Sequence, residues 1–181
     1  MQEKNNPIYQ RDVLEFVTVA VQYCAYLEDL EERSRSELID TMSKLLPLLY
    51  LKGTLLPQYE TFSDEVLSDY VTEENYNIIR NNIAFIMADK DDYLDVFVAD
   101  MKYSDEPILM TISENLADIY QDIKNFAYIY KQGVEEEMMS ALELCNQNFK
   151  TDWGQKLVNV LRAIHEVKYS FNDIDDEDYI Q

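Results

Sequence analysis

The chain has 181 residues, of which 36 are Asp or Glu and 15 are Lys or Arg, for a formal net charge of −21. Nucleic-acid binding draws much of its strength from Lys and Arg that neutralise phosphates, so we expect neither nucleic acid nor an anionic membrane surface as a partner. The hydrophobic content of 47% is that of an ordinary globular protein, and the length suits one domain.

Apolar residues recur at intervals of three and four, the period of an α-helix, and only three glycines and four prolines interrupt the chain. The sequence predicts an all-α fold, a single-domain bundle of about five to seven helices over residues 1–171. Residues 172–181 are rich in aspartate, which predicts an acidic, flexible C-terminal tail. Numerous tyrosines predict rings inside the core and hydroxyl groups at helix seams, at Tyr23, Tyr26, Tyr120, Tyr128 and Tyr130.

The first third of the chain predicts two helices. The first spans residues 12–32, where apolar residues form one stripe. Ser34 and Glu37 then have the spacing of a capping box, a reciprocal pairing at a helix start, so a second helix is expected over residues 35–51. Pro47 lies inside this helix and should kink or shorten it, because proline removes a backbone donor and crowds the preceding turn.

The middle third is acidic, and its patterns are weaker. A helix is expected over residues 73–87, after Thr72, whose hydroxyl suits a helix N-terminus. Residues 93–99 fit either a short helix or an extended segment.

The last third predicts two long helical runs. One spans residues 104–132, with Pro107 in its first turn, where proline is tolerated, and Gly133 as a left-handed stop. The other spans residues 135–169, with a break expected at Thr151, whose hydroxyl suits a fresh helix start.

The cysteines and the chain start indicate a cytoplasmic protein. Cys24 and Cys145 lie among apolar residues far apart in the sequence, which predicts two buried thiols and no disulfide framework. Residues 1–8 lack the apolar core of a signal peptide. The longest apolar runs, over residues 45–51 and 83–88, fall short of the roughly 20 residues that a membrane-spanning helix needs.

Three acids spaced four residues apart, Glu114, Asp118 and Asp122, are the most informative pattern in the chain. At about 100° per residue, Glu114 points about 170° from the centre of the apolar stripe of its helix, Asp118 about 130° and Asp122 about 90°. The acids therefore turn from solvent toward the packing boundary, where Asn115 also lies. Glu114 is expected to be solvated.

Three interpretations of these acids compete. The favoured one is a solvated face with hydrogen bonds from Asp118 and Asp122 to Tyr and Lys of neighbouring helices. A polar groove for a partner is the second. The third is a Mg²⁺ or Mn²⁺ site, since hard cations prefer carboxylate oxygens. A di-iron site is disfavoured, because it needs Glu-x-x-His pairs and His165 has Arg162 three residues before it.

An enzymatic alternative follows from the segment Asn115-Leu-Ala-Asp118. It resembles the Glu-x-x-Asp half of the all-α nucleotide pyrophosphatases, whose carboxylates hold Mg²⁺ against a triphosphate. The other half would come from Asp92 and Asp95, or from the acids of residues 28–31. The amide of Asn115 cannot bring a carboxylate charge to the metal, which weakens this analogy.

Three features of the last helical run remain. Trp153 next to Gly154 suits close helix packing, with a partner needed for the indole N–H. His165 is the only histidine, and we expect it at the packing boundary, hydrogen-bonded to a neighbour. Residues 150–168 form the one basic stretch of the chain, which we expect to pair with the acids of residues 114–122.

Two blocks of sequence resemble a known family. The first runs from Leu116-Ala-Asp-Ile-Tyr-Gln-Asp122 to Gly133, and the second from Phe149 through Trp153-Gly154 to His165. Together they are similar to the signature of a bacterial family named domain of unknown function 5063. The resemblance implies an α-helical fold and no established activity, substrate or catalytic residue. The family often has a histidine before the Trp-Gly pair, where this chain has Asp152.

The sequence thus favours a cytoplasmic, non-catalytic protein-interaction or accessory module, with no catalytic residue and no cofactor. A protein partner is expected, a basic one suits the charge, and homo-oligomerisation is a further option. The candidate interaction cluster comprises Asn115, Asp118, Asp122, Trp153 and His165. The alternative is a metal-dependent nucleotide or phosphate-ester hydrolase, whose candidate Mg²⁺ or Mn²⁺ ligands are Glu114, Asp118, Asp122, Asp92 and Asp95.

Overall fold

The computed structural model describes residues 6–58, 67–95 and 108–170. Its α-helices are α1 (Arg11–Glu28), α2 (Arg35–Thr54), α3 (Glu73–Met87), α4 (Ile112–Gln132), α5 (Glu135–Asn148) and α6 (Gly154–Tyr169). Short elements are the 3₁₀ turns η2 (Pro7–Tyr9) and η3 (Ala88–Lys90), the π-helical turn η5 (Phe149–Trp153), and the strands β1 (Asp92–Leu94) and β2 (Leu109–Thr111). The predicted all-α, single-domain fold is confirmed, with a two-stranded antiparallel sheet added to it.

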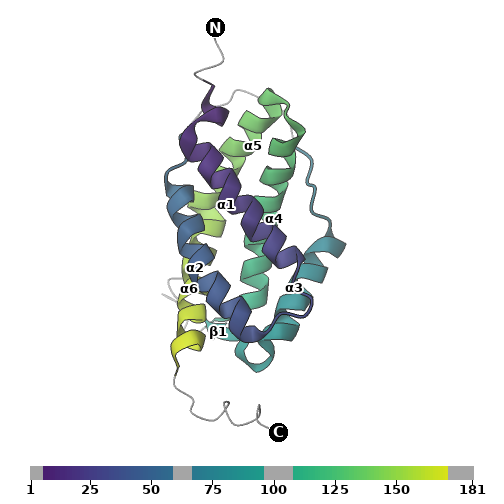
Figure 1. Ribbon diagram of the computed structural model, residues 1–181, viewed down its shortest axis with the longest axis vertical. Coiled ribbons are helices and arrows are strands. Elements are labelled where there is room, and N and C mark those ends of the chain that lie inside the picture. The colour runs from purple at the N-terminus through teal and green to yellow at the C-terminus, as the bar shows by residue number, and fades with distance from the viewer. Residues whose placement is uncertain (1–5, 59–66, 96–107, 171–181) are drawn as a thin grey trace.

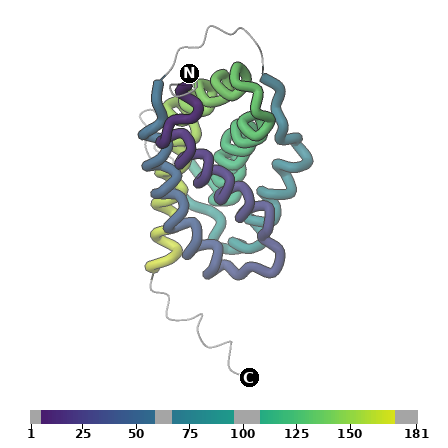
Figure 2. The backbone as a smooth tube through the Cα atoms, turned by 45° about the horizontal axis from the view of Figure 1, so that its top comes forward, coloured from purple at the N-terminus to yellow at the C-terminus, as the bar shows by residue number. Residues whose placement is uncertain are grey.

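Helix α4 is the central element of the bundle. It packs against α1, α3, α5 and α6, while α2 packs against α1 and α6. In Figure 1, α1 crosses in front of α4, and α3 lies on the flank. Figure 2 shows the same arrangement with the upper end turned forward. Apolar residues from all six helices form one core cluster, in which Trp153, Tyr23 and Phe16 are among the largest fully buried side chains.

Most of the predicted helix ends are confirmed. Ser34 and Glu37 form the capping box at the start of α2. The hydroxyl of Thr72 accepts a hydrogen bond from the backbone N–H of Asn75 at the start of α3. Gly133 follows α4 with a φ of 77°, a left-handed conformation that glycine adopts without strain. Pro47 does not shorten α2, which continues to Thr54, three residues beyond the predicted end.

The start of α4 differs from the prediction. Ser104 and Pro107 lie outside the described residues, and residues 109–111 are extended, so the helix begins only at Ile112. Thr111 is its N-cap, with a hydroxyl that accepts a hydrogen bond from the N–H of Glu114. The pairing of β2 with β1 holds this segment extended, which a pattern of local residue types does not reveal. Residues 93–99 were expected to form either a short helix or an extended segment. Tyr93 and Leu94 lie in strand β1, and residues 96–99 lie outside the described range.

The predicted break in the last run is confirmed, although its mechanism is different. The chain passes from α5 through the π-helical turn η5 into α6. The hydroxyl of Thr151 donates to the carbonyl of Gln147 and so does not cap the new helix. The proposed tail, residues 172–181, lies outside the described residues.

The two cysteines are free and buried, as predicted. Burial raises the pKa of both the Cys24 and the Cys145 thiol, which keeps them in the neutral form. Within the described residues, no helix combines the length and the apolar character needed to cross a bilayer.

Candidate functional site

The three acids of α4 follow the predicted rotation from solvent toward the helix seams. Glu114 is exposed, whereas Asp118 and Asp122 are partly buried. The two inner carboxylates therefore lie between helices, and their partners decide whether they form a site.

Asp118 joins three helices. Its Oδ1 accepts a hydrogen bond of 2.7 Å from the hydroxyl of Tyr76 on α3, and its Oδ2 lies 2.8 Å from Nζ of Lys156 on α6. Lys156 also lies 2.9 Å from Asp152. Burial, and next the hydrogen bond to Asp118, raise the pKa of Tyr76. Burial lowers the pKa of Lys156, but the hydrogen bonds to both acids outweigh it and leave that pKa raised. The predicted pairing of the basic stretch with this helix is thus confirmed at Lys156.

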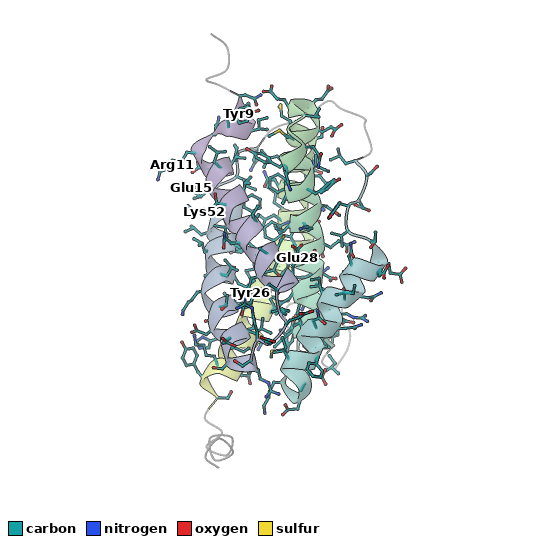
Figure 3. All side chains as sticks on the ribbon, turned by 45° about the vertical axis from the view of Figure 1, so that its right-hand side comes forward. Tyr9, Arg11, Glu15, Tyr26, Glu28 and Lys52 are labelled. Atoms are coloured by element: carbon teal, nitrogen blue, oxygen red, sulfur yellow. The ribbon has the colours of Figure 1, made fainter. Side chains whose placement is uncertain are left out.

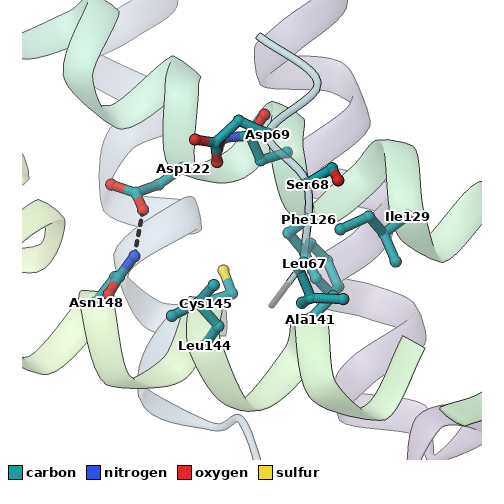
Figure 4. Close-up of a pocket in the computed structure, with 11 residues that line it drawn as sticks. Leu67, Ser68, Asp69, Asp122, Phe126, Ile129, Ala141, Leu144, Cys145 and Asn148 are labelled. Atoms are coloured by element: carbon teal, nitrogen blue, oxygen red, sulfur yellow. Dashed lines mark hydrogen bonds between the residues drawn. The ribbon is translucent and has the colours of Figure 1, made fainter. Parts of the chain in front are cut away.

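Asp122 faces α5 and a small pocket. Its Oδ1 accepts a hydrogen bond of 2.6 Å from the side-chain amide of Asn148 (Figure 4). Partial burial raises the pKa of Asp122, and the hydrogen bond from Asn148 offsets only part of that effect. The pocket beside it has a volume of about 60 Å³, with Asp69 and Cys145 in its lining. This volume holds a few water molecules and is too small for a nucleotide.

The other candidate metal ligands are not brought to these acids. Asp92 lies in β1 opposite Thr111, and Asp95 accepts a hydrogen bond of 2.6 Å from the side-chain amide of Asn159 on α6. Among the described residues, no group of three or more His, Cys, Asp or Glu side chains could hold a metal ion. The structure therefore does not bring the five candidate ligands together around one point.

Asn115 points away from the acids and into the interior. It is 1% exposed, and its side-chain amide donates to the hydroxyl of Tyr93 on β1. Its Oδ1 has no hydrogen-bond partner among the described residues. Asn115 thus fixes the small sheet against α4 and is not available to a partner in solution.

Trp153 and His165 lie in different environments. Trp153 is fully buried, with its indole N–H donating to the carbonyl of Cys145 at 3.0 Å, so the predicted partner exists. The residue that packs against Gly154 is Phe149 of η5, whereas the close approach of another helix is made by Gly53 of α2. His165 is exposed, and its ring contacts that of Tyr169. The five residues of the predicted cluster therefore do not form one site.

A larger pocket lies between α1 and α2. It has a volume of about 340 Å³, and we call it the α1–α2 groove. Its lining residues are Gln22, Tyr26, Asp40, Thr41, Lys44, Leu45 and Leu48. The hydroxyl of Tyr26 is buried and has no hydrogen-bond partner among the described residues, and the guanidinium of Arg33 lies 4.6 Å from the centre of its ring.

Charged contacts frame the α1–α2 groove. Toward the N-terminal end of α1, Glu15 pairs with Arg11 at 2.6 Å and with Lys52 of α2 at 2.5 Å; Figure 3 labels these residues and Tyr26. This groove is not evident from the sequence, because it depends on which sides of α1 and α2 meet. The available sequence signal was the number of leucines on α2, of which Leu48 and Leu51 prove to be exposed.

The fold and the polar contacts define an all-helical bundle in which carboxylates at the helix seams bind neighbouring helices. It has an open groove on its surface between α1 and α2. The chain belongs to the family described as Domain of unknown function (DUF5063), whose model matches residues 7–170. The resemblance seen in the last third of the sequence is thus confirmed over almost the whole chain.

A solved structure supports the same assignment. The crystal structure of protein BF1032 from Bacteroides fragilis is similar to this chain, with 49% sequence identity and a TM-score of 0.82. The similarity covers 91% of this chain and 96% of that one. No curated protein matches the chain.

Proposed function

We propose that the chain is a cytoplasmic, non-catalytic protein-interaction module that binds a helix of a basic partner protein in the α1–α2 groove. The observation that carries this proposal is the groove itself, an open volume of about 340 Å³ with apolar walls on the surface of the bundle. Recognition of an amphipathic helix by an apolar groove is a recurring mode of protein binding.

The walls of the groove suit an apolar helix face. Leu45 and Leu48 line it from α2, and the ring of Tyr26 lines it from α1. Leu48 is 42% exposed and Leu51, one turn further along α2, is 51% exposed, so an apolar row continues beyond the pocket. Burial of these side chains by a partner would remove apolar surface from water, which is the main driving force of association.

The charge of the chain indicates which kind of partner protein it would bind. The net charge of −21 attracts a basic protein and repels an acidic one. Lys44, the one basic residue in the lining, lies 2.6 Å from Asp40, which also pairs with Lys168 at 2.9 Å.

The polar contacts of α4 support a role without catalysis. Tyr76 and Lys156 hold Asp118, and Asn148 holds Asp122, so both carboxylates are engaged in contacts between helices. A carboxylate that serves a metal or a substrate needs oxygens directed at a shared open space.

The test compares two leucine variants. The full-length chain is used to capture partners from an extract of the source cells, and the captured protein is purified and titrated by calorimetry. We expect Leu48→Lys to weaken binding by about tenfold or more, since loss of a central apolar anchor costs at least about 1.4 kcal/mol. Leu144→Lys is the matched control, because Leu144 lies on α5 and is 47% exposed.

Two results would contradict the proposal. The first is equal affinity of the captured protein for wild type and for Leu48→Lys. The second is failure to capture any stable partner together with metal-dependent turnover of a nucleotide or phosphate ester by the purified chain.

A further inference from the structure

A short segment before α3 forms one wall of the pocket beside Asp122. Residues 67–71, which we call the strap, lead directly to Thr72, the N-cap of α3. Three residues of the strap line this pocket of about 60 Å³, namely Leu67, Ser68 and Asp69. Figure 4 shows them across the pocket from Cys145 of α5. The strap therefore separates this part of α5 from solvent.

One side chain of α4 holds the strap. The side-chain oxygen of Asn125 accepts hydrogen bonds from the backbone N–H groups of Tyr70 and Val71, at 2.9 and 2.8 Å. The side-chain amide of Asn125 donates to a carboxylate oxygen of Asp69 at 3.1 Å. Among the described residues, these are all of the hydrogen bonds between the strap and other elements. Asn125 thus binds three groups of the strap at once.

An aromatic contact on the surface adds to this attachment. The ring of Tyr70 stacks on that of Tyr128, which follows Asn125 on α4 by about one turn, with 3.8 Å between the ring centres. Both tyrosines are 39% exposed. The stack therefore strengthens the contact between the strap and α4 without filling the pocket underneath.

The strap is attached less firmly than the helices around it. Ser68, Asp69 and Tyr70 are exposed and Leu67 is half-buried, so Val71 is the only buried residue of the segment. A cavity lies beside the strap where a closely packed core would place side chains. Segments with few buried apolar contacts open at a lower free energy than the fold as a whole. The strap is thus a segment that can detach while the bundle stays folded.

We propose that the strap is a lid over the pocket beside Asp122, and that Asn125 is the latch that holds it closed. Opening breaks the three hydrogen bonds to Asn125 and moves one wall of the pocket away from α5. The open pocket presents the carboxylate of Asp122 and the thiol of Cys145 to solvent. This device is separate from the α1–α2 groove, since the two have no lining residue in common.

Alkylation of Cys145 measures this opening. The full-length chain is treated with iodoacetamide, and mass spectrometry follows each cysteine separately. Cys24 and Cys145 are both 3% exposed, but only Cys145 lines the pocket, so Cys24 is an internal control. The labelling rate of a buried thiol follows the fraction of molecules in which its surroundings are open. We expect Asn125→Ala to raise the rate at Cys145 by about tenfold or more and to leave the rate at Cys24 unchanged.

Two further variants separate the latch from overall stability. Ser34→Ala removes the capping box of α2 and destabilises the whole fold, so it should change both rates by the same factor. Tyr70→Ala loses the exposed ring stack and keeps the bundle intact, so it should raise the rate at Cys145 alone, by about threefold. Wild-type labelling of Cys145 in Asn125→Ala would overturn the inference. So would an equal rise at both cysteines, or a Cys145 that reacts in the folded wild type as fast as in urea.

Discussion

Asp118 of α4 accepts a hydrogen bond of 2.7 Å from the hydroxyl of Tyr76 on α3, while its other oxygen pairs with Lys156 of α6 at 2.8 Å. One carboxylate thus connects three helices of the bundle. Both of its oxygens have partners from outside its own helix, which is the arrangement of a structural contact. The favoured interpretation of the α4 acids, hydrogen bonds to Tyr and Lys of neighbouring helices, describes Asp118.

We expect the loss of this carboxylate to destabilise the fold. Asp118→Asn removes the charge that Lys156 pairs with and should lower the free energy of unfolding by about 1 kcal/mol, a value reduced by the partial exposure of the pair. Glu114→Gln, one turn earlier on the exposed side, should change it by less than about 0.5 kcal/mol. Urea unfolding of the two variants and wild type measures both values. Equal stability of all three proteins would contradict the structural role.

A metal titration tests the enzymatic alternative. Since Asp118 is held by Tyr76 and Lys156, we expect Mg²⁺ and Mn²⁺ to shift the melting temperature equally in wild type and in Asp118→Asn. A ligand that binds only the folded state raises its melting temperature, so a true site would show a larger shift in wild type. That larger shift would restore the metal-dependent hydrolase as the better interpretation.

The sequence predicts the helices of this fold better than their contacts. Caps such as Ser34 and Gly133 act within one turn of the chain, and local residue types therefore reveal them. The rotation of Glu114, Asp118 and Asp122 is also a local property, since it follows from the helical period.

Features that depend on tertiary pairing were not predictable in the same way. The sheet that delays the start of α4 needs the pairing of Tyr93 with Met110, which are far apart in sequence. Asn148, the partner of Asp122, has no distinguishing pattern around it. The α1–α2 groove likewise appears only once the two helices are placed together.

Removal of the hydroxyl group from two tyrosines of α1, Tyr23 and Tyr26, should have different effects on the stability of the fold. Tyr23 donates to the carbonyl of Leu116 at 2.8 Å in the core, so Tyr23→Phe leaves that contact unmade and should destabilise the fold by about 1 kcal/mol. The Tyr26 hydroxyl is buried without a partner among the described residues, so Tyr26→Phe should be neutral or stabilising by up to about 1 kcal/mol. Denaturant unfolding measures both, and a destabilised Tyr26→Phe would show that this hydroxyl has a partner in solution.

The stability of the fold should depend on pH through Asp122 in an unusual direction. Partial burial raises the pKa of Asp122 above that of an exposed aspartate. The folded state therefore holds this proton more tightly than the unfolded state, and ionisation lowers the free energy of unfolding as pH rises through the interval between the two pKa values. Asp122→Asn cannot ionise and keeps an oxygen that accepts from Asn148. We expect this variant to gain stability relative to wild type at neutral pH and to lose that gain below the ordinary pKa of aspartate.

Asp40 provides a control of opposite sign. Hydrogen bonds from Lys44 and then from Lys168 lower the pKa of Asp40, so its ionised form contributes stability above the ordinary pKa of aspartate and loses it as pH falls through the lowered value. Asp40→Asn should therefore be less stable than wild type at neutral pH, and the difference should disappear in acid. Urea unfolding across this pH range measures the stability of each variant relative to wild type. As pH rises, this relative stability should increase for Asp122→Asn and decrease for Asp40→Asn. Parallel curves for Asp122→Asn and wild type would mean that Asp122 is solvated and not enclosed beside Asn148.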